Sequence, residues 1–457
     1  MALRAIRLLV SKGKTNLARI NDITNPTSTV KRERLVILGT GWGSYSVLKT
    51  IDKNKFDVIV VSPRNHFLFT PLLCSTTVGT LEFRSVIEPV RNTIFRQPDH
   101  FHLSFATKLD IENKKIHCES VLKSELKYTI DFDKLLIGVG ALSNTFNVPG
   151  VQEHSFFLKV RFNVPGVQEH SFFLKEVADA RRIRNRILKN FELSVQPGIE
   201  ESEANRLLHT VIVGGGPTGV EFGAELYDFV EQDISRLYKQ KKHHVNVTLV
   251  ESNQILASFD ESLRKYAEKK IKERDRFQLV KSIVTEVKKD CVILSNGETI
   301  PCGMVVWSGG IAPRQFVSDL DLKKNKQGQI LTDKYLHVLG DDSKSVFAIG
   351  DCADIQDMPL PCTAQVAERE GRYLAKMLNH GKEFAEPFEF QSMGMLAYIG
   401  KYQALTDVKQ IKMQGFTSWI VWRSAYLTRL GSWRLRMQVP IDWLKTLMYG
   451  RDISRFD

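Results

Sequence analysis

The sequence predicts an α/β protein that contains two Rossmann-like dinucleotide-binding domains. The first observation is a strand, a glycine-rich turn, a helix and a second strand between Glu33 and Ser62, the unit that holds a dinucleotide pyrophosphate at a helix N-terminus. The second is that this unit recurs between Leu208 and Glu251, which chance rarely produces. The third is that strands and helices alternate along 457 residues, enough chain for two or three cored domains.

The two glycine-rich turns supply what a nucleotide phosphate needs from the backbone. In the first unit, the apolar run Leu35–Leu38 leads into GTGWGS. Gly39 permits a tight turn, Gly41 lets the backbone approach a phosphate, and Ser44 is small enough for the helix to pack close to the strand. In the second unit, Val211–Val213 leads into GGGPTG. A strand, turn and helix without a ligand is the plain alternative, which the flanking strands and the recurrence disfavour.

The two units differ in the residue that follows the second strand. The run Val245–Val250 ends at Glu251, an acid suited to bridging ribose hydroxyls. The run Phe56–Val61 ends at Ser62, whose hydroxyl makes only part of the contact with two ribose oxygens. Arg64 is a nearby charged donor for adenosine or a phosphate. Together the two units predict that the chain binds two dinucleotides.

The net charge restricts the partners. A formal charge of +12 suggests an acidic partner surface, for which nucleic acid is the general candidate. No long basic block with interleaved aromatic residues lies in the body of the chain, and much of the excess charge lies near its two ends. An anionic membrane surface fits this distribution better, and no nucleic-acid partner is predicted.

The cysteines are interpreted as reduced and mostly buried thiols. The six are Cys74, Cys118, Cys291, Cys302, Cys352 and Cys362. They form no Cys-x-x-Cys pair and no metal-ligand spacing, so no metal site is predicted. A disulfide framework is typical of small secreted chains, and the absence of a redox pair argues against a flavin–disulfide reductase.

Residues 1–31 are interpreted as a mitochondrial transit peptide. They carry six basic residues against one acid, Asp22, and the apolar residues between Leu3 and Val10 form one helical face. A basic, acid-poor, amphipathic start is typical of such peptides. A disordered basic tail is the alternative.

The stretch between the two units is predicted to contain a ribbon, a crossover and a linker. Phe101–Ile130 alternates as an antiparallel β-ribbon does. Phe132–Ala141 is a strand that ends in a glycine-rich turn, which suits a crossover between domains. Val177–Leu193 is a basic amphipathic helix, and Val195–Arg206 is interpreted as a polar linker.

The segment FNVPGVQEHSFFLK occurs twice without change, as Phe146–Lys159 and Phe162–Lys175, joined by Val160-Arg161. One extra copy is not a solenoid, which needs several stacked units. It indicates a recent tandem duplication or an error in deriving the sequence. Only one copy can occupy a given packing site, so the other is expected to be an extruded loop, and no function is assigned to it.

Beyond the second unit, Leu263–Glu273 is predicted to be helical and Val284–Ile300 to form a hairpin around an Asn-Gly pair. Met304–Gly310 is another strand that ends in glycines. Ser345–Cys352 is a strand that delivers Asp351 at its C-terminal end, where α/β sheets place ligand contacts. A helix cap is the other interpretation of Asp351.

The C-terminal region is predicted to be an amphipathic helical membrane anchor. From Ser418 onward it holds four of the six tryptophans, interspersed with arginines, and Pro440 is expected to divide it into two short helices. No uncharged run is long enough to span a bilayer, so the helices are expected to lie in the interface. A helical hairpin docked on the protein core or on a dimer partner is the alternative.

Several segments carry a specific resemblance, which runs in family order from Arg34 to Arg451. They are GTGWGS, SPRNHFLFTPLL, GVGALSNTF, IVGGGPTGVEFGAEL, TLVES, FAIGDC, TAQVAEREG, SAYLTRLGSW and IDWLKTLMYGRD. They resemble the type II NADH:quinone oxidoreductases, above all the mitochondrial single-subunit enzymes of fungi and plants. The resemblance implies a glutathione-reductase-like fold with a discontinuous FAD-binding domain (32–145 and 325–385), a linker with the duplication (146–206), an NADH-binding domain (207–324) and a membrane-anchoring domain (386–457).

The resemblance also implies roles for single residues. The residues implied to bind FAD are Gly39, Gly41 and Gly43 at the phosphates, Ser62 and Arg64 at adenosine, Thr70 and Pro71 near the flavin, and Asp351 at the ribityl chain. The residues implied to hold NADH are Gly214, Gly216, Gly219 and Glu251, with Glu221 as a catalytic residue near the nicotinamide. Gly310, which ends a variant of the family's WATG, and Ala364 are also implied to bind cofactor. Ala364 and Gln365 begin the motif on the quinone side. The sequence departs from the family at Glu368 and Arg369, where close relatives carry His and Gln.

The implied activity is the oxidation of NADH by hydride transfer to bound FAD and the reduction of ubiquinone, without proton pumping. The implied catalytic residues on the quinone side are Gln365 and Glu368. The implied setting is a homodimer peripheral to the mitochondrial inner membrane. Three alternatives stay open at this point: a soluble NADH oxidase, a flavoprotein like apoptosis-inducing factor, and an NAD(H)-sensing module without turnover.

Overall fold

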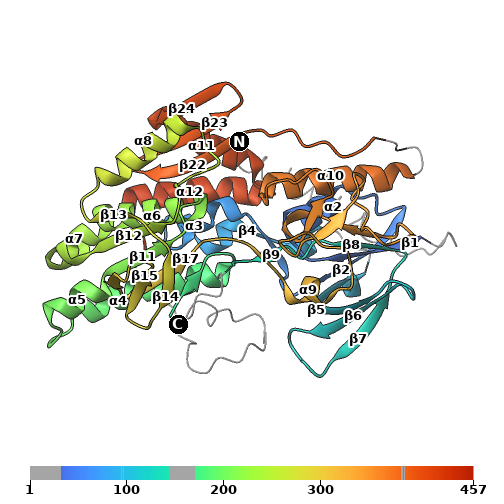
Figure 1. The fold of residues 1–457 in the computed structure, drawn as a ribbon, viewed down its shortest axis with the longest axis horizontal. Coiled ribbons are helices and arrows are strands. Elements are labelled where there is room, and N and C mark those ends of the chain that lie inside the picture. Colours follow the sequence, from blue (N-terminus) through green and yellow to red (C-terminus); the bar gives the residue numbers. More distant parts are fainter. Residues whose placement is uncertain are drawn as a thin grey trace, which may run out of the picture.

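The computed structural model describes residues 32–93, 95, 97–144, 170–381, 384 and 386–455 (Figure 1). Residues 1–31, interpreted as a transit peptide, lie outside the described residues, as do the first copy of the repeat and most of the second. The described chain forms two lobes, each built on a largely parallel sheet, and an antiparallel sheet with two helices that packs on the second lobe. The predicted α/β class with two Rossmann-like units is confirmed.

The first lobe holds the first nucleotide unit. Its sheet, among the described residues, has seven strands in the order β20 (Val346–Ala348), β8 (Lys134–Ile137), β1 (Glu33–Leu38), β2 (Phe56–Ser62), β5 (Phe101–Asp110), β6 (Lys115–Ser120) and β7 (Lys127–Asp131). The first five are parallel, and β5, β6 and β7 pair antiparallel, which confirms the predicted ribbon. Helices α2 (Trp42–Thr50) and α10 (Ala364–His380) pack against each other beside it.

The second lobe holds the second unit. The described strands of its sheet run parallel in the order β10 (Phe172–Phe173), β17 (Met304–Trp307), β11 (His209–Val213), β12 (Asn246–Glu251) and β13 (Phe277–Lys281). Its helices are α4 (Val177–Ser194), α5 (Glu201–Leu207), α6 (Pro217–Phe229), α7 (Ser235–Leu237) and α8 (Glu261–Lys272). The centres of β11, β12 and β17 are largely apolar, because helices and a second small sheet bury both faces of this part of the sheet. Val211 and Ile212 accordingly have no exposed surface.

Short elements connect the lobes and cover their edges. They are β3 (His66–Leu68), β4 (Ile87–Pro89), β9 (Ala141–Leu142), β14 (Val284–Val287), β15 (Cys291–Leu294), β16 (Thr299–Pro301), β18 (Ala312–Pro313), β19 (Ile330–Thr332), β21 (Ala353–Ile355), α3 (Leu73–Thr76) and α9 (Gln315–Asp319). The two glycine-rich crossovers meet where β9 pairs antiparallel with β18. The predicted hairpin is a three-stranded meander, β14–β15–β16, and its second turn is at the Asn-Gly pair.

One interpretation of the segment between the lobes is wrong. The sequence predicts a polar linker over Val195–Arg206, but α5 occupies the whole second half of this segment. The helix is short and polar, so its periodicity is weak, yet Ala204 and Leu207 are buried against the lobe. Packing of these two side chains therefore decides the structure, not the polar composition.

The C-terminal region begins with a meander, β22 (Met395–Gly400), β23 (Gln403–Val408) and β24 (Ile411–Gly415), and ends with α11 (Phe416–Arg429) and α12 (Trp433–Tyr449). The prediction that Pro440 divides the helices is wrong, because Pro440 lies inside α12. The chain breaks instead at Leu430-Gly431-Ser432, where the Ser432 hydroxyl accepts a hydrogen bond from the Leu435 N–H at 3.4 Å. The proline removes a single backbone donor from a helix that is held by packing on both sides of it.

These two helices are docked on the protein and also expose apolar side chains. Trp422, Leu435 and Val439 are buried in the core. The apolar residues of α12 that face outward, here called the α12 stripe, are Trp433, Met437, Ile441, Leu444, Leu447 and Met448, each between 46% and 76% exposed. No helix of the described chain is both long enough and apolar enough to cross a membrane.

Two arginines of this region have their charged groups held within the protein. Arg451 is buried and pairs with Asp233 at 2.8 Å. Arg423 lies between the rings of Trp419 and Trp443, 4.2 Å from each centroid. Because these guanidinium groups have partners within the protein, the apolar stripe and not the arginines is the unusual feature of the surface.

Candidate functional site

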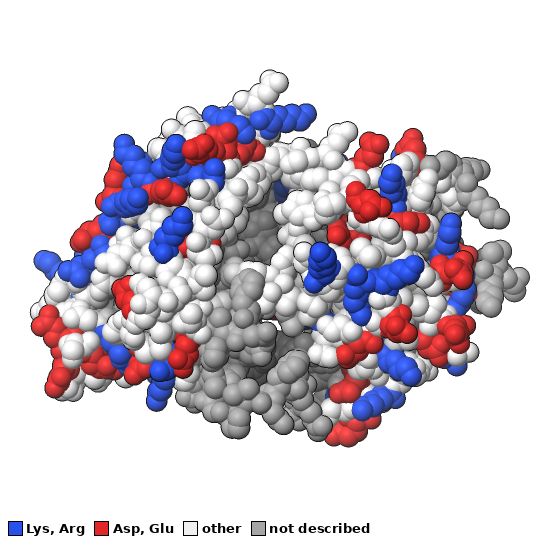
Figure 2. Space-filling view, in the orientation of Figure 1, with Lys and Arg blue, Asp and Glu red and all other residues white. Residues whose placement is uncertain are grey.

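One large cavity of about 1720 Å³ lies between the two lobes. In Figure 2 charged side chains lie mainly over the outer parts of both lobes, and the described surface between them is mostly uncharged. Of the residues predicted from the sequence, those that line the cavity are Gly39, Gly41, Gly43, Ser62, Arg64, Thr70, Pro71, Glu221, Gly310, Asp351, Ala364, Gln365 and Glu368. Those that do not are Gly214, Gly216, Gly219 and Glu251.

The first glycine-rich turn has the form that a dinucleotide phosphate requires. Gly39 has φ of +96°, and a Cβ there would lie 2.5 Å from the carbonyl oxygen of Gly138. A Cβ on Gly41 would meet no atom within 4 Å, so the backbone is bare toward the cavity where α2 begins. Ser44 donates to the carbonyl oxygens of Leu38 and Gly138, each at 3.3 Å. The turn therefore leaves the backbone open at the N-terminus of α2, which fits a pyrophosphate.

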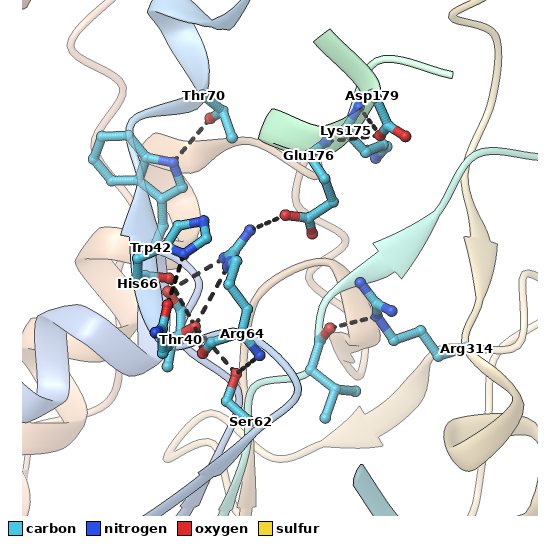
Figure 3. A network of polar contacts seen from close by, with 12 residues as sticks. Thr40, Trp42, Ser62, Arg64, His66, Thr70, Lys175, Glu176, Asp179 and Arg314 are labelled. Atoms are coloured by element: carbon cyan, nitrogen blue, oxygen red, sulfur yellow. Dashed lines mark hydrogen bonds and ion pairs between the residues drawn. The ribbon is translucent and has the colours of Figure 1, made fainter. Parts of the chain in front are cut away.

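A polar network surrounds the end of β2 (Figure 3). The hydroxyls of Thr40 and Ser62 lie 3.2 Å apart, and Ser62 accepts a hydrogen bond from the Arg64 N–H at 3.2 Å. The Arg64 guanidinium bonds Glu176 at the start of α4, with Nη1 2.5 Å from Oε2. The site at β2 thus contains a carboxylate that comes from the segment beside the second lobe.

Two further groups of Figure 3 line the cavity. The Trp42 indole donates to the Thr70 hydroxyl at 2.9 Å, which fixes the turn carrying Thr70 and Pro71 beside α2. The Arg314 guanidinium donates to the Val139 carbonyl oxygen at 2.7 Å. Burial lowers the pKa of Arg314 below its usual value, but the group stays a cation at neutral pH.

The start of α10 closes the cavity beside Asp351. Thr363 caps the helix through the Val366 N–H at 3.3 Å, and Ala364 is its first residue. The Glu370 carboxylate accepts the Gly350 N–H at 2.7 Å, and burial raises its pKa to about 7. These contacts hold the turn of Asp351 against the N-terminus of α10.

The residues predicted on the quinone side lie where α10 meets the loop before β22. The Gln365 carboxamide accepts the Met393 N–H at 2.8 Å and donates to the Gly394 carbonyl oxygen at 3.5 Å. Glu368 accepts a hydrogen bond from Arg372 at 2.6 Å and is partly exposed to the cavity. The Tyr426 side of α11 lines the same end of the cavity.

Glu221 is the buried acid of the cavity. It is 7% exposed, and its carboxylate accepts the Tyr398 N–H at 3.0 Å. Burial, and then the charge of Glu225, raises the pKa of Glu221 to about 8. Glu225, one turn along α6, accepts hydrogen bonds from Ser75 and Thr80 at 2.7 Å each. A carboxyl group in this position holds a proton at neutral pH.

The second glycine-rich turn has the same backbone features as the first, but its glycines do not line the cavity. Gly214 has φ of +107°, and a Cβ on Gly219 would lie 2.0 Å from the Gly214 carbonyl oxygen. A Cβ on Gly216 would meet nothing within 4 Å. Glu251 accepts the Gly215 N–H at 2.7 Å and the Asn253 N–H at 2.9 Å, so its carboxylate lies at the mouth of the turn.

Sequence reasoning missed Trp42, Glu176 and Arg314 as cavity residues. Glu176 follows directly on a repeated segment, and Arg314 follows a glycine crossover, so no spacing rule connects either one to β2. The β9–β18 pairing, which brings the two crossovers together, was the missing information.

Glu201, His243 and His244 form the one cluster of possible metal ligands found in the described residues, with donor atoms within 4.8 Å of one another. The cluster is not part of the cavity lining. Burial lowers the pKa of His244, and the charges of Lys241 and Arg276 act in the same direction. The same cations oppose a bound metal ion, and no role is assigned to the cluster.

Comparison with known proteins agrees with this geometry. Residues 33–371 match the family described as pyridine nucleotide-disulphide oxidoreductase, and residues 393–452 match the NDH2 C-terminal domain. The chain is 44% identical to the mitochondrial internal alternative NAD(P)H-ubiquinone oxidoreductase A1 of Arabidopsis thaliana, over 94% of this chain and 87% of that protein. It is 37% identical to the mitochondrial external NADH-ubiquinone oxidoreductase 2 of Saccharomyces cerevisiae, over 93% and 83%. The structure of NDH2 from Plasmodium falciparum in complex with NADH is similar with a TM-score of 0.85 at 26% identity, over 93% of this chain and all of that one.

Proposed function

The chain belongs to the pyridine nucleotide-disulphide oxidoreductases and, among them, to the type II NADH dehydrogenases, and from this membership we infer that it is an FAD-dependent NADH:ubiquinone oxidoreductase. It oxidises NADH and reduces ubiquinone at the mitochondrial inner membrane, as the names of its plant and yeast relatives support. The observation that carries this function is the cavity, which joins the bare glycine turn of the first unit to Glu221 of the second and to the start of α10.

We propose that the cavity holds FAD, with Gly39, Gly41 and Gly43 at the phosphates and Asp351 at the ribityl chain. Bound there, FAD would supply a hydride acceptor for NADH and a two-electron donor for the quinone. The protein orients the two substrates and excludes water from the cavity between the lobes. NADH is held by Gly214, Gly216, Gly219 and Glu251, so that its nicotinamide approaches the cavity past Thr218 and Glu221, which line its wall.

The proton that the reaction consumes indicates a role for Glu221. Oxidation of NADH and reduction of a quinone to a quinol consume one proton from solution for each turnover. Glu221 keeps a proton at neutral pH because burial raises its pKa to about 8. We propose that it holds this proton at the cavity wall, while Gln365, fixed by the loop at Met393, positions the quinone end. Glu368 replaces the family histidine and adds a carboxylate there, paired with Arg372.

The domain organisation follows from the same proposal. The FAD-binding domain comprises 32–145 and 325–385, the NADH-binding domain 207–324, and the membrane-anchoring domain 386–457. The strand order supports the two-part FAD-binding domain, because β20 joins the first sheet after the whole second sheet has been formed. The end of the linker 146–206 packs with the NADH-binding domain, because β10 pairs with β17 in the second sheet. Homodimer formation is proposed on the resemblance alone.

The α12 stripe supports membrane association by the last domain. A soluble NADH oxidase has no use for six outward apolar side chains on one helix, whereas a quinone with a long tail is reached in the bilayer. Replacing Met437, Ile441 and Leu444 by Gln should release the protein from vesicles and lower the reduction of long-tailed quinone. Flavin content and ferricyanide reduction should persist, because these side chains are exposed.

The matched control replaces Leu122 and Leu126 by Gln, which are exposed leucines of the turn between β6 and β7. This variant should still pellet with vesicles. If the α12 variant pellets as well as the control, the stripe is not the membrane contact. If the unmodified chain oxidises NADH with dioxygen but not with quinone, the soluble oxidase is the correct function.

A further inference from the structure

The first nucleotide unit lacks an acid at its ribose position, yet a carboxylate reaches that position from elsewhere. Rossmann units place an acid at the end of the second strand to bind the ribose hydroxyls. Here β2 ends at Ser62, which is 2% exposed and bonded within the protein to Thr40 and the Arg64 N–H. A single buried hydroxyl does not replace a carboxylate, which accepts two hydrogen bonds at once.

Glu176 brings that carboxylate to β2. Its Oε2 lies 2.5 Å from Nη1 of Arg64, and the two side chains are 31% and 20% exposed. Both residues line the cavity, together with Ser62. Figure 3 shows the Glu176 side chain extending from the start of α4 toward Arg64, over the network of Thr40 and Ser62.

The backbone holds Glu176 firmly in this place. Glu176 and Asp179 form a capping box at the entry to α4, in which the Glu176 carboxylate accepts the Asp179 N–H. The Asp179 carboxylate in turn accepts the N–H groups of Lys175 at 3.0 Å and Glu176 at 2.8 Å. Leu174 is buried, and Phe172–Phe173 form β10 at the edge of the second sheet. A carboxylate on such a base is preorganised for a ligand.

The charges around Glu176 fit the adenosine half of a dinucleotide. Arg64 pairs with the Glu176 carboxylate, the charge of Arg314 interacts with it, and both guanidinium groups line the cavity. Two cations and one carboxylate suit a ligand that carries both phosphates and ribose hydroxyls, because guanidinium groups bind phosphate and a carboxylate accepts from hydroxyls.

We propose that Glu176 accepts the hydrogen bonds of the adenosine ribose of FAD, in place of the acid that is missing at Ser62. The inference rests on the proposed function, since it assumes that FAD occupies the cavity. It makes Glu176 a cofactor-binding residue supplied by the segment between the two domains, with Arg64 as the residue that positions its carboxylate.

The two copies of the repeat differ in the residue that follows them, so only the second copy places a carboxylate beside Arg64. The two copies are identical through FFLK, but Val160 follows the first copy and Glu176 follows the second. The end of the second copy forms β10 in the described structure. If the first copy took that place, a valine would stand at the position of Glu176 and Arg64 would lose its partner.

The test is flavin binding by the full chain, stripped of flavin and titrated with three probes: FAD, FAD whose adenosine lacks the 2′-hydroxyl, and FMN. Glu176→Gln should weaken FAD binding roughly ten- to hundredfold, the fold-change of one charge-assisted hydrogen bond. The loss should be much smaller for the 2′-deoxy probe and absent for FMN, which has no adenosine. Glu200→Gln, a change at the exposed N-cap of α5, is the matched control and should bind all three as the unmodified chain does.

The variant Asp179→Asn distinguishes a ribose contact by Glu176 from a purely structural role of Glu176 at the N-terminus of α4. If it weakens FMN and FAD binding together while Glu176→Gln weakens FAD alone, the ribose contact stands. An equal loss for FAD and its 2′-deoxy form in Glu176→Gln would overturn the proposal, since Glu176 would then act only through Arg64. A chain that binds FAD tightly and is indifferent to Glu176→Gln also overturns it, whereas failure of the unmodified chain to bind FAD would refute the proposed function instead.

Discussion

The two nucleotide units have the same strand, turn and helix arrangement. They differ in how far apart in the sequence the residues of each site lie. In the second unit, the glycine turn and Glu251 belong to one continuous βαβ segment, and the acid bonds the turn directly through the Gly215 N–H. In the first unit, the glycine turn and Arg64 are local, but other cavity residues come from distant segments, among them Glu176, Arg314 and the start of α10. The residues of the second site come from a single βαβ unit, whereas those of the first site come from several segments that the tertiary structure brings together.

This difference fits the proposal that FAD stays bound at the first unit, whereas NADH enters and leaves the second unit in each turnover. A cofactor that stays bound through turnover is held by contacts from many segments. All of these contacts must break before the cofactor dissociates. A substrate that enters and leaves in each cycle is better served by a local site at the surface. We therefore expect changes in the first unit to act on flavin content and changes in the second to act on KM for NADH.

The largest effect is expected at the first turn. Gly39→Ala should abolish FAD binding and lower Tm, because its φ of +96° disfavours a side chain and the Cβ would meet Gly138. Gly41→Ala should lower flavin content without lowering the Tm of the flavin-free chain, since its Cβ has open space. In the second unit Gly216→Ala should leave flavin content unchanged and raise KM for NADH. Loss of flavin in Gly216→Ala would contradict the claim that the second unit acts on NADH binding and not on flavin binding.

The next effect concerns Glu221, which lies on the second unit and faces the cavity. Glu221→Gln should lower quinone-dependent kcat by about 100-fold, within the range of a lost proton donor. In the unmodified enzyme activity should fall as the pH rises above about 8, where Glu221 loses its proton, and the variant should lack this decline. Glu231→Gln, at a partly exposed carboxylate paired with Lys242, is the control and should behave normally.

The same proton affects stability with a defined sign. The folded chain keeps it up to a pKa of about 8, whereas the unfolded chain releases it near 4.5. The folded state therefore binds more protons between these values, and the contribution of this group to stability is complete at low pH and is lost as the pH rises through about 8. Glu221→Gln should flatten this part of the curve of Tm against pH, and an unchanged slope would show that the group is ionised in the folded protein.

A smaller effect is expected for the choice of nicotinamide. Glu251 would repel a 2′-phosphate, and Ser252-Asn253 offers no arginine to receive one. The unmodified enzyme should prefer NADH to NADPH at neutral pH, and Glu251→Gln should relax the preference by about tenfold, one charge contact. Equal kcat/KM for both nucleotides in the unmodified enzyme would contradict the role given to this local acid.

The smallest effect is expected from removing the extra copy of the repeat. Deleting Phe146–Arg161 leaves one copy of FNVPGVQEHSFFLK directly before Glu176. Because the described end of the second copy already forms β10, flavin content should be unchanged and Tm unchanged or higher. Loss of FAD on this deletion would show that both copies support the first site.

What the sequence predicted well was local. Both βαβ units, the ribbon and the Asn-Gly turn follow from short patterns, because backbone geometry near glycine and strand periodicity depend on neighbouring residues. Pro440 and α5 were misread because tertiary packing overrides a proline or a polar composition. Glu176 could not be found, since its proximity to Ser62 depends on where β10 and α4 lie against the first sheet.

The most direct test of the central claim is the absorbance spectrum of the purified full chain, recorded before NADH, after NADH in the absence of oxygen, and after a quinone is then added. An FAD-dependent NADH:quinone oxidoreductase should show a visible flavin band that bleaches with NADH and returns with the quinone. A chain without a flavin band, or a bleached band that the quinone does not restore, would contradict this function.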